Sequence, residues 1–499
     1  MDAINNTIEI IKFIKKVYDK YSAYKASDKM IAEAHIRLGT TLTTLRLFEE
    51  YLRMSTESTP VSSDVELTIY HTLSALKSHA DQLESILPQG TSVLTKIDWV
   101  TQTEARVKDS IARLRGWAED ASRLCMMLNM VKQCSERSRP LEPVDVSQSG
   151  FASAVELSKR ILDMDTFDRN AKEEIEKLRL KSFISTYGKD TSDLTLGIYE
   201  QRTVLVEVHR FDRFVEEHSK QYQLDRALRF AWVFQSSDLP SIHLLPCLGH
   251  QTQDDSSRYV TVYELPTRLS KRLDPRQPQV PTLAHILQNS TRIAMEDRYR
   301  IAVNICDAVL AIHSAGWVHK SIRSDTILVA AAEESEDPKM PVRVDAAYLV
   351  GCQTIRPRLE MSTQYPEQDP IKRMYQHPER QGGVEGGMVK KFDIRHDMYS
   401  LGAVLLEIGY RKTLQDLFST PDSTHLSPKG RENNHQRLLK HAHRVSDKMG
   451  TKYARATLAC LERSTKMGVT VDKLREEFYG QVLCPLKEIL GGMEVSGSI

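Results

Sequence analysis

The chain has 499 residues, which at about 150 residues per domain predicts two to four domains with a sizeable core. Its 68 Lys and Arg residues nearly balance its 67 Asp and Glu residues. This balance excludes a protein that binds nucleic acid or an anionic membrane through bulk charge alone. Glycine is scarce at 22 residues, which argues against a protein built around glycine-rich phosphate loops.

The seven cysteines are dispersed, and none has the spacing to another Cys or to His that is typical of a zinc site. We therefore expect reduced core thiols, no metal and no cofactor. The N-terminus contains Asp2 and no continuous apolar stretch of the kind found in signal peptides. The longest apolar runs, 327–332 and 401–406, fall far short of the roughly 18 residues of a membrane-spanning helix. These features predict a cytoplasmic protein.

Residues 1–135 show apolar positions that recur every three or four residues, which predicts four amphipathic helices. Short breaks separate the segments, so we expect them to pack as an all-α four-helix bundle. The expected apolar stripes are Ile4, Ile8, Ile11, Ile14, Val17 and Tyr21 in the first helix; Ile31, Ala34, Leu38, Leu42, Leu45 and Leu52 in the second; Val65, Ile69, Leu73, Leu76, Ala80, Leu83 and Leu87 in the third; and Val107, Ile111, Leu114, Ala118, Ala121, Leu124 and Leu128 in the fourth.

The first helix is less regular, because Ile10 and Phe13 fall outside its stripe and lysines crowd its second half. It is either a bundle helix with solvated lysines or a helix that leaves the bundle to lie in a membrane interface. Periodicity leaves both readings open. The candidate membrane-contacting residues are Ile4, Ile8, Ile11, Lys12, Phe13, Lys15, Lys16 and Lys20.

Four short segments of this region carry a resemblance. They are Tyr18-x-x-Tyr21, Ile36-Arg37-Leu38, Lys96-Ile97-Asp98-Trp99 and Leu114-x-x-Trp117. In this order they resemble the HeLo and HeLo-like domains, the N-terminal helical bundles of fungal cell-death and heterokaryon-incompatibility proteins. The resemblance implies membrane targeting or permeabilisation by a released N-terminal helix.

Residues 136–182 begin with a polar stretch that carries two prolines, which predicts a linker. Connecting helices are expected after it. From residue 183 the pattern changes to short β-branched runs, which predict strands at 194–199, 203–209, 243–248 and 259–265. Helices are expected to follow at 283–288 and 297–315. Strands followed by helices predict an α+β arrangement.

Three motifs occur in the C-terminal part. They are Ile312-His-Ser-Ala-Gly-Trp-Val-His319-Lys-Ser-Ile-Arg-Ser-Asp-Thr-Ile-Leu-Val, Tyr375-Gln-His-Pro378-Glu379 and Asp397-Met-Tyr-Ser-Leu-Gly402. In this order they resemble the catalytic loop, the end of the activation segment and the following helix of protein kinases. The resemblance implies a bilobal kinase-like domain over 183–490, with a tail at 491–499. It implies scaffold roles for His319, Gly351, Pro378, Glu379, Asp397 and Gly402, and Asp397 is expected to accept backbone amides of the catalytic loop.

The chemistry of phosphoryl transfer is not retained at the matching positions. Ser321 replaces the catalytic aspartate, and Thr326 replaces the metal-binding asparagine. Leu349 replaces the second metal-binding aspartate, with Asp345 a nearby alternative, and Glu207 replaces the strand lysine, with Lys189 upstream. No glycine-rich loop precedes them. We therefore expect a pseudokinase with no catalytic residue, which binds ATP without Mg²⁺ or not at all.

The order of bundle, connector and pseudokinase is similar to that of the mixed-lineage-kinase-like necroptosis effectors. It implies a signalling or cell-death effector with an upstream protein activator, homo-oligomers on activation and conditional contact with an anionic plasma membrane, but no nucleic-acid partner. The candidate phosphorylation sites are Thr354, Ser362, Thr363 and Tyr365. Two alternatives stay open: an atypical active kinase that uses Asp325 or Asp345, and a scaffold without membrane activity. The polar residues 412–438 are expected to form a mobile insert.

Overall fold

The computed structural model describes residues 2–23, 38, 41–42, 45, 49, 73, 76–78, 157, 160, 178–180, 185–186, 193–210, 217–235, 239–252, 258–274, 280–289, 292–315, 317–331, 341–351, 356–357, 369–381, 392–418, 428–465, 474 and 477–496. The chain divides into two compact units, Met1–Val155 and Glu156–Ile499. None of the helices within these ranges is both long enough and apolar enough to cross a membrane.

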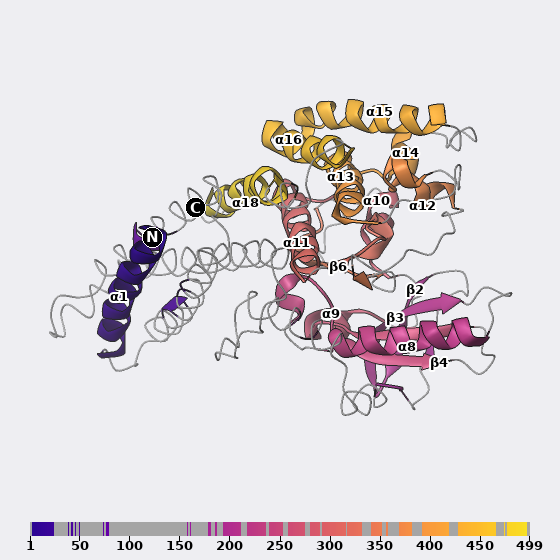
Figure 1. Cartoon of the computed structure of the whole chain (residues 1–499), viewed down its shortest axis with the longest axis horizontal. Coiled ribbons are helices and arrows are strands. Elements are labelled where there is room, and N and C mark those ends of the chain that lie inside the picture. The colour runs from indigo at the N-terminus through magenta and orange to yellow at the C-terminus, as the bar shows by residue number, and fades with distance from the viewer. Residues whose placement is uncertain are drawn as a thin grey trace. The chain divides into compact units, whose positions relative to one another are not determined.

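In the first unit, helix α1 spans Asp2–Ala23 (Figure 1). Its buried face is formed by Thr7, Ile10, Ile14 and Val17, which recur every three or four residues as one helical stripe. The predicted stripe is confirmed at Ile14 and Val17, which are buried. It is wrong elsewhere, because Ile8 and Ile11 are only half-buried, whereas Ile10, expected outside the stripe, is buried. Apolar residues occur nearly all round this helix, so the sequence alone could not decide which of them faces the interior.

Other stripe positions of the first unit agree with the prediction where the structure describes them. Leu38, Leu42 and Leu45 of the second segment are helical and buried, and so are Leu73 and Leu76 of the third. The predicted fourth helix and the linker up to residue 150 lie outside the described residues.

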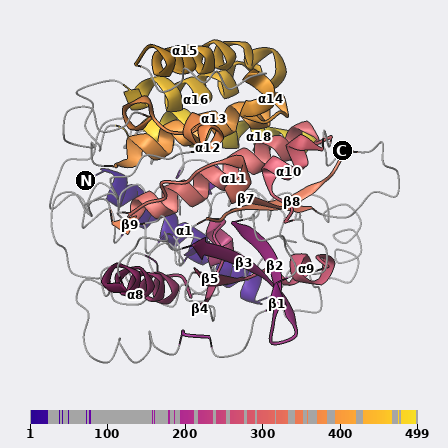
Figure 2. The ribbon, with the colours of Figure 1, turned by 90° about the vertical axis from the view of Figure 1, so that its right-hand side faces the viewer.

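The second unit combines α and β structure. Its strands are β1 (Ser185–Thr186), β2 (Leu194–Tyr199), β3 (Arg202–Arg210), β4 (Cys247–Thr252), β5 (Arg258–Glu264), β6 (Trp317–Val318), β7 (Ile327–Ala331), β8 (Val344–Leu349) and β9 (Arg356–Pro357). The first five form one antiparallel sheet in the order β1-β2-β3-β5-β4, while β6 pairs with β9 and β7 with β8. Helix α8 (Glu217–Val233) lies along this sheet in both views (Figures 1 and 2).

The predicted strands agree with the structure except for one. Strands β2, β3 and β5 fall within one residue of the predicted ranges, because their β-branched and apolar residues suit a sheet that is covered on both faces. The strand expected at 243–248 is misplaced. A short 3-10 helix, η1 (Leu239–Ile242), is followed by His243 in the left-handed region (φ 59°), and β4 begins only at Cys247.

The remaining elements are mainly helical, and apart from α9, which lies beside the sheet, most of them form the other half of the unit (Figure 2). They are α9 (Thr267–Arg272), α10 (Leu283–Gln288), α11 (Met295–Ser314), η2 (Ser324–Thr326), α12 (Pro370–Met374), η4 (Pro378–Arg380), α13 (Ile394–Tyr410), α14 (Leu414–Phe418), α15 (Pro428–Arg444), α16 (Ser446–Thr465), the π-helical turn η6 (Phe478–Leu483) and α18 (Cys484–Ser496). Helices α10 and α11 confirm the two helices predicted at 283–288 and 297–315.

Helix α13 is at the centre of this helical half, and nearly all of its residues are buried. It begins at the cap Asp393, whose side chain accepts the N–H of Arg395 and whose backbone N–H is bound by His396, an arrangement that satisfies the first donors of a helix. Gly402 permits close packing on α16, because a Cβ at this position would lie 2.8 Å from Leu461 Cγ.

The stretch 412–438, expected to form a mobile insert, is mainly helical where the structure describes it. Residues 414–418 form α14, and Pro428 is the first residue of α15. Proline favours this position because its fixed φ suits a first helical turn that needs no N–H donor. The prolines that indicated a loop therefore include one that starts a helix.

Candidate functional site

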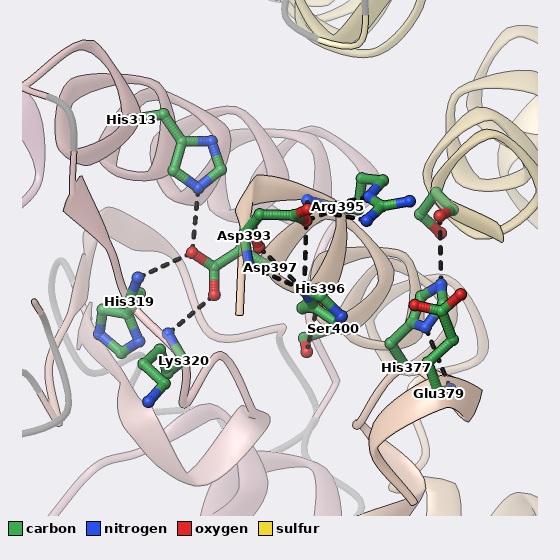
Figure 3. A network of polar contacts seen from close by, with 11 residues as sticks. His313, His319, Lys320, His377, Glu379, Asp393, Arg395, His396, Asp397 and Ser400 are labelled. Atoms are coloured by element: carbon green, nitrogen blue, oxygen red, sulfur yellow. Dashed lines mark hydrogen bonds and ion pairs between the residues drawn. The ribbon is translucent and has the colours of Figure 1, made fainter. Parts of the chain in front are cut away.

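The loop 319–326 between strands β6 and β7 is held by one buried carboxylate, that of Asp397 in the first turn of α13. Its Oδ2 accepts the backbone N–H of His319 at 2.7 Å, and its Oδ1 accepts that of Lys320 at 2.8 Å (Figure 3). His313 Nε2 lies 3.0 Å from the same Oδ2. The contact expected of Asp397 is therefore present, and the carboxylate fixes where the loop begins.

The charges around this anchor reinforce it. Burial alone would raise the pKa of Asp397, but the hydrogen bond from His313 and the neighbouring histidines and amides outweigh burial and lower it. Burial lowers the pKa of His319 to about 4, so its ring is neutral at neutral pH, and its Nδ1 accepts the N–H of Ser321 at 3.3 Å. Lys320 takes a left-handed φ of 72°, which is uncommon for a residue with a side chain.

Ser321 and Thr326, which the sequence comparison matched to a catalytic aspartate and a metal-binding asparagine, carry hydroxyl groups. Thr326 Oγ1 donates to the carbonyl of Ser321 at 2.7 Å and accepts the N–H of Arg323 at 3.0 Å. Ser321 Oγ accepts a hydrogen bond from Arg323 Nη1. Both hydroxyls are therefore used to shape the loop, and neither supplies the negative charge that binds a metal ion or accepts a proton.

The end of β8 runs directly beside this loop. Val350 N–H donates to the carbonyl of Thr326 at 2.9 Å, and Gly351 follows with a φ of 77°. A Cβ on Gly351 would lie 2.7 Å from Thr326 Cγ2, so the missing side chain permits the contact. Leu349 is fully buried here. Asp345 is exposed near the start of β8, so the geometry places Leu349 rather than Asp345 beside the loop.

Glu207 on β3 reaches the same region from the sheet. It is 1% exposed, and its Oε2 accepts the hydroxyl of Tyr263 at 2.7 Å. Its Oε1 lies 4.0 Å from the position that a Cβ of Gly351 would occupy. The structure thus brings together Glu207, Thr326 and Gly351, which are separated widely in sequence.

The groups that meet here set limits on the chemistry. Glu207 repels phosphate when it is ionised, and the hydrocarbon side chain of Leu349 cannot bind a metal ion. Asp325 is nearly half-exposed, and Arg323 Nε donates to its carboxylate at 2.9 Å. Within the described parts of β3, β8 and the loop, the converging side chains offer hydrogen bonds but no pair of carboxylates for a metal ion.

A buried polar network missed by the sequence reasoning lies behind the loop. Tyr375 Oη donates to Glu407 Oε1 at 2.7 Å and lies 3.0 Å from Ser324 Oγ. The N–H of Leu414 donates to the same Glu407 oxygen at 2.8 Å. Burial raises the pKa of Glu407 to about 8, although these hydrogen bonds oppose it. The available signal was a single glutamate in the apolar run Leu401–Ile408 of a predicted helix.

The other predicted scaffold residues lie on α13 and the segment before it. Gly402 contacts α16, as described above. Pro378 starts η4, and the half-buried Glu379 follows it. The backbone N–H of Glu379 donates to Nδ1 of His377 at 3.2 Å.

The predicted membrane-contacting residues are described only in part. Lys12, Lys15 and Lys16 are exposed on α1, and Ile8, Ile11 and Phe13 are half-buried. Ile4 and Lys20 belong to α1, but their side chains lie outside the described residues. So do Lys189 and the predicted phosphorylation sites Thr354, Ser362, Thr363 and Tyr365.

No protein-family model matches the chain. No curated protein matches it either.

Proposed function

We propose that this protein is a signalling or regulated cell-death effector. In this proposal, the second unit is a bilobal kinase-like domain that has lost phosphoryl transfer, and it controls a membrane-active helical bundle in the first unit. One observation carries the proposal: the loop 319–326 is anchored on Asp397 as a kinase scaffold requires, yet Ser321, Thr326 and Leu349 stand at its chemical positions.

The arrangement of the second unit supports the kinase-like part. An antiparallel sheet with helix α8 beside it forms one half, and helices around α13 form the other. The loop 319–326 and the end of β8 connect the two halves, where the resemblance to kinases expects a catalytic site. Glu207 approaches this point from the sheet, where it would repel the phosphates that a lysine would hold.

The exposed side of α1 supports the membrane part. Lys12 follows Ile8 by four residues and Lys15 follows Ile11 by four, so each lysine lies next to a half-buried isoleucine. Apolar area and positive charge on one face add in binding to an anionic interface. The near-zero net charge of the chain does not oppose this, because the lysines act locally.

A nucleotide test separates the pseudokinase from an atypical active kinase. The full chain is heated with ATP, with and without Mg²⁺, and phosphate transfer to the chain and to a generic protein substrate is measured. We expect no Mg²⁺-dependent shift of the melting temperature and no transfer. A Mg²⁺-dependent shift followed by transfer would contradict the proposal and favour catalysis through Asp325 or Asp345.

A charge-reversal test separates a membrane effector from a scaffold. The full chain and a variant with Lys12, Lys15 and Lys16 changed to Glu are sedimented with anionic and with neutral vesicles, and their toxicity in cells is compared with that of residues 1–150. The matched control changes the exposed Lys271, Lys412 and Lys440 to Glu, which alters the net charge equally. We expect only the α1 variant to lose vesicle binding and toxicity. Equal behaviour of both variants would favour the scaffold.

A further inference from the structure

Three metal-binding side chains meet away from the loop 319–326. They are His377 and Glu379, which flank Pro378, and His396 in the first turn of α13. One ligand atom from each residue lies within 4.8 Å of the other two. The two imidazole rings are 5.0 Å apart between centroids at an angle of 75°, and both residues are at least 97% buried. Figure 3 shows this cluster beside the Asp397 anchor.

His396 has a buried nitrogen that needs a partner. Its Nδ1 lies 3.2 Å from Asp393 Oδ1 and 3.3 Å from the Asp393 carbonyl, whereas its Nε2 has no hydrogen-bond partner among the described residues. Nδ1 also accepts the backbone N–H of Asp393 at 2.9 Å, so the ring proton sits on Nε2 in the metal-free protein. Metal binding at Nε2 therefore requires the proton to move to Nδ1, where the carboxylate or carbonyl of Asp393 accepts it. A carboxylate behind the ring and a lone pair in front are the arrangement found in metal-ligating histidines. A buried unpaired nitrogen is otherwise costly.

His377 is oriented in a similar way. Its Nε2 lies 3.1 Å from the carbonyl of Ser464, which can only accept, so the proton sits on Nε2 and the lone pair on Nδ1. That lone pair accepts the backbone N–H of Glu379 at 3.2 Å, near the long end of the hydrogen-bond range. A metal ion can therefore replace a weak contact at Nδ1 without disturbing the bond to Ser464.

The charges around the cluster suit a divalent cation. Glu379 supplies one carboxylate, and the neighbouring guanidinium of Arg395 is neutralised by Asp393 through bonds of 2.8–3.2 Å. Two neutral imidazoles and one carboxylate are a ligand set typical of zinc, with a fourth position for water. Magnesium and calcium prefer ligand sets made entirely of oxygen. We propose that His377, Glu379 and His396 bind one Zn²⁺ ion.

This site would act as a clamp. Zinc bonds of about 2.0–2.1 Å would draw the three ligand atoms closer together than 4.8 Å. The ion would join the segment around Pro378 to the start of α13 and, through the His377 bond to Ser464, to the end of α16. The clamp is independent of nucleotide chemistry, so it goes beyond the proposed function.

The first experiment measures metal binding to the full chain after treatment with a chelator. Zn²⁺ is titrated against a competing chelator, its stoichiometry is measured by elemental analysis, and Co²⁺ is used as a visible probe of tetrahedral coordination. We expect one Zn²⁺ per chain and an intense Co²⁺ absorption that Zn²⁺ abolishes. Failure to bind Zn²⁺ in a one-to-one ratio would overturn the proposal.

Variants test which side chains bind the ion. We expect Glu379→Gln and His396→Gln to weaken Zn²⁺ binding by at least about 100-fold, since loss of an outer-shell partner alone costs 10–100-fold. The matched control is His443→Gln, because His443 is exposed on α15. The Zn²⁺ affinity of this variant should equal that of the wild type. A wild-type Zn²⁺ affinity in Glu379→Gln would overturn the proposal. Glu379 is only half-buried, so we expect this variant to fold, and it tests the site even if His396→Gln does not fold.

Asp393→Asn tests the second layer of the site. Asparagine caps a helix as well as aspartate does, so α13 should be retained, which circular dichroism can verify. The substitution removes the carboxylate that orients His396, and we expect about 10–100-fold weaker Zn²⁺ binding with the Co²⁺ absorption preserved at high Co²⁺. An unchanged affinity would show that His396 does not bind the ion.

Discussion

The two sides of the loop 319–326 differ in the side chains that they carry and in the contacts that these side chains make. On one side, Asp397 holds two backbone amides and a histidine with an ionised, fully buried carboxylate. On the other side are Ser321, Thr326 and Leu349, the positions that the proposed resemblance to kinases matches to nucleotide-contacting residues. The first side depends on one carboxylate that accepts specific hydrogen bonds, whereas the side chains of the second side contribute hydroxyl hydrogen bonds within the loop and apolar packing.

This difference shows that the shape of the loop and its chemistry have separate causes. The shape depends on backbone donors, which every sequence presents and which must be paired when buried. The chemistry depends on a few side chains that the fold does not need. A chain can therefore keep the shape of this loop whatever side chains it carries at the chemical positions, provided that the anchoring carboxylate stays.

The largest effect is expected on the anchoring side. Replacement of Asp397 by Ala leaves the amides of His319 and Lys320 and the ring of His313 without their buried acceptor. We expect a loss of about 3–5 kcal/mol in the free energy of unfolding of the second unit, measured by chemical denaturation. The exposed Asp345→Ala is the control and should change stability by less than about 0.5 kcal/mol. Similar values for the two variants would refute the comparison.

The network behind the loop should respond to pH. The folded pKa of Glu407 is about 8 and its ordinary value is 4.5, so between these values the unfolded chain releases a proton that the folded chain keeps. The contribution of Glu407 to stability is therefore present below pH 4.5 and lost progressively up to pH 8. Its size is on the order of a few kcal/mol. Glu407→Gln, which resembles the protonated acid, should remove this part of the pH dependence in denaturation curves. An unchanged slope would contradict the assignment.

Packing around the anchor should give a smaller effect. Gly402→Ala places a Cβ 2.8–2.9 Å from Leu461 and Cys460, and we expect a loss of about 1–3 kcal/mol in the same denaturation experiment. The control is Gly480→Ala, because a Cβ there meets nothing within 4 Å. If both variants are equally stable, α13 and α16 are not held as closely as the structure indicates.

The smallest effect is expected on the chemical side. Ser321→Asp restores a carboxylate at a half-buried position next to Arg323, so the free energy of unfolding should change by less than about 0.5 kcal/mol. It should not restore phosphate transfer, because Leu349 and Glu207 remain. A large loss of stability would show that the two sides of the loop are not separate.

The sequence predicted those features that depend on local pattern or on a long motif. The alternation of β-branched residues located β2, β3 and β5, and the helical period located α10 and α11. The resemblance of the motif ending in Gly402 to protein kinases implied that Asp397 accepts backbone amides of the loop, and this contact is present.

Features that depend on distant partners were not predictable. The buried face of α1 was predicted only in part, because apolar residues extend beyond one stripe of that helix and only its neighbours decide between Ile8 and Ile10. The pairing of His377 with His396 depends on how the segment after Tyr375 returns to the start of α13. Spacing along the chain therefore gave no zinc pattern.

The contact between Gly351 and Thr326 limits the substitutions that positions 351 and 326 can accept during evolution. Because a Cβ at position 351 would meet a methyl group at 2.7 Å, residue 351 cannot enlarge before residue 326 becomes smaller. Position 326 should therefore vary toward smaller residues, whereas position 351 should stay glycine, among the descendants of this sequence. Loss of the threonine alone does not release the glycine, because a φ of 77° at position 351 disfavours every residue that has a side chain.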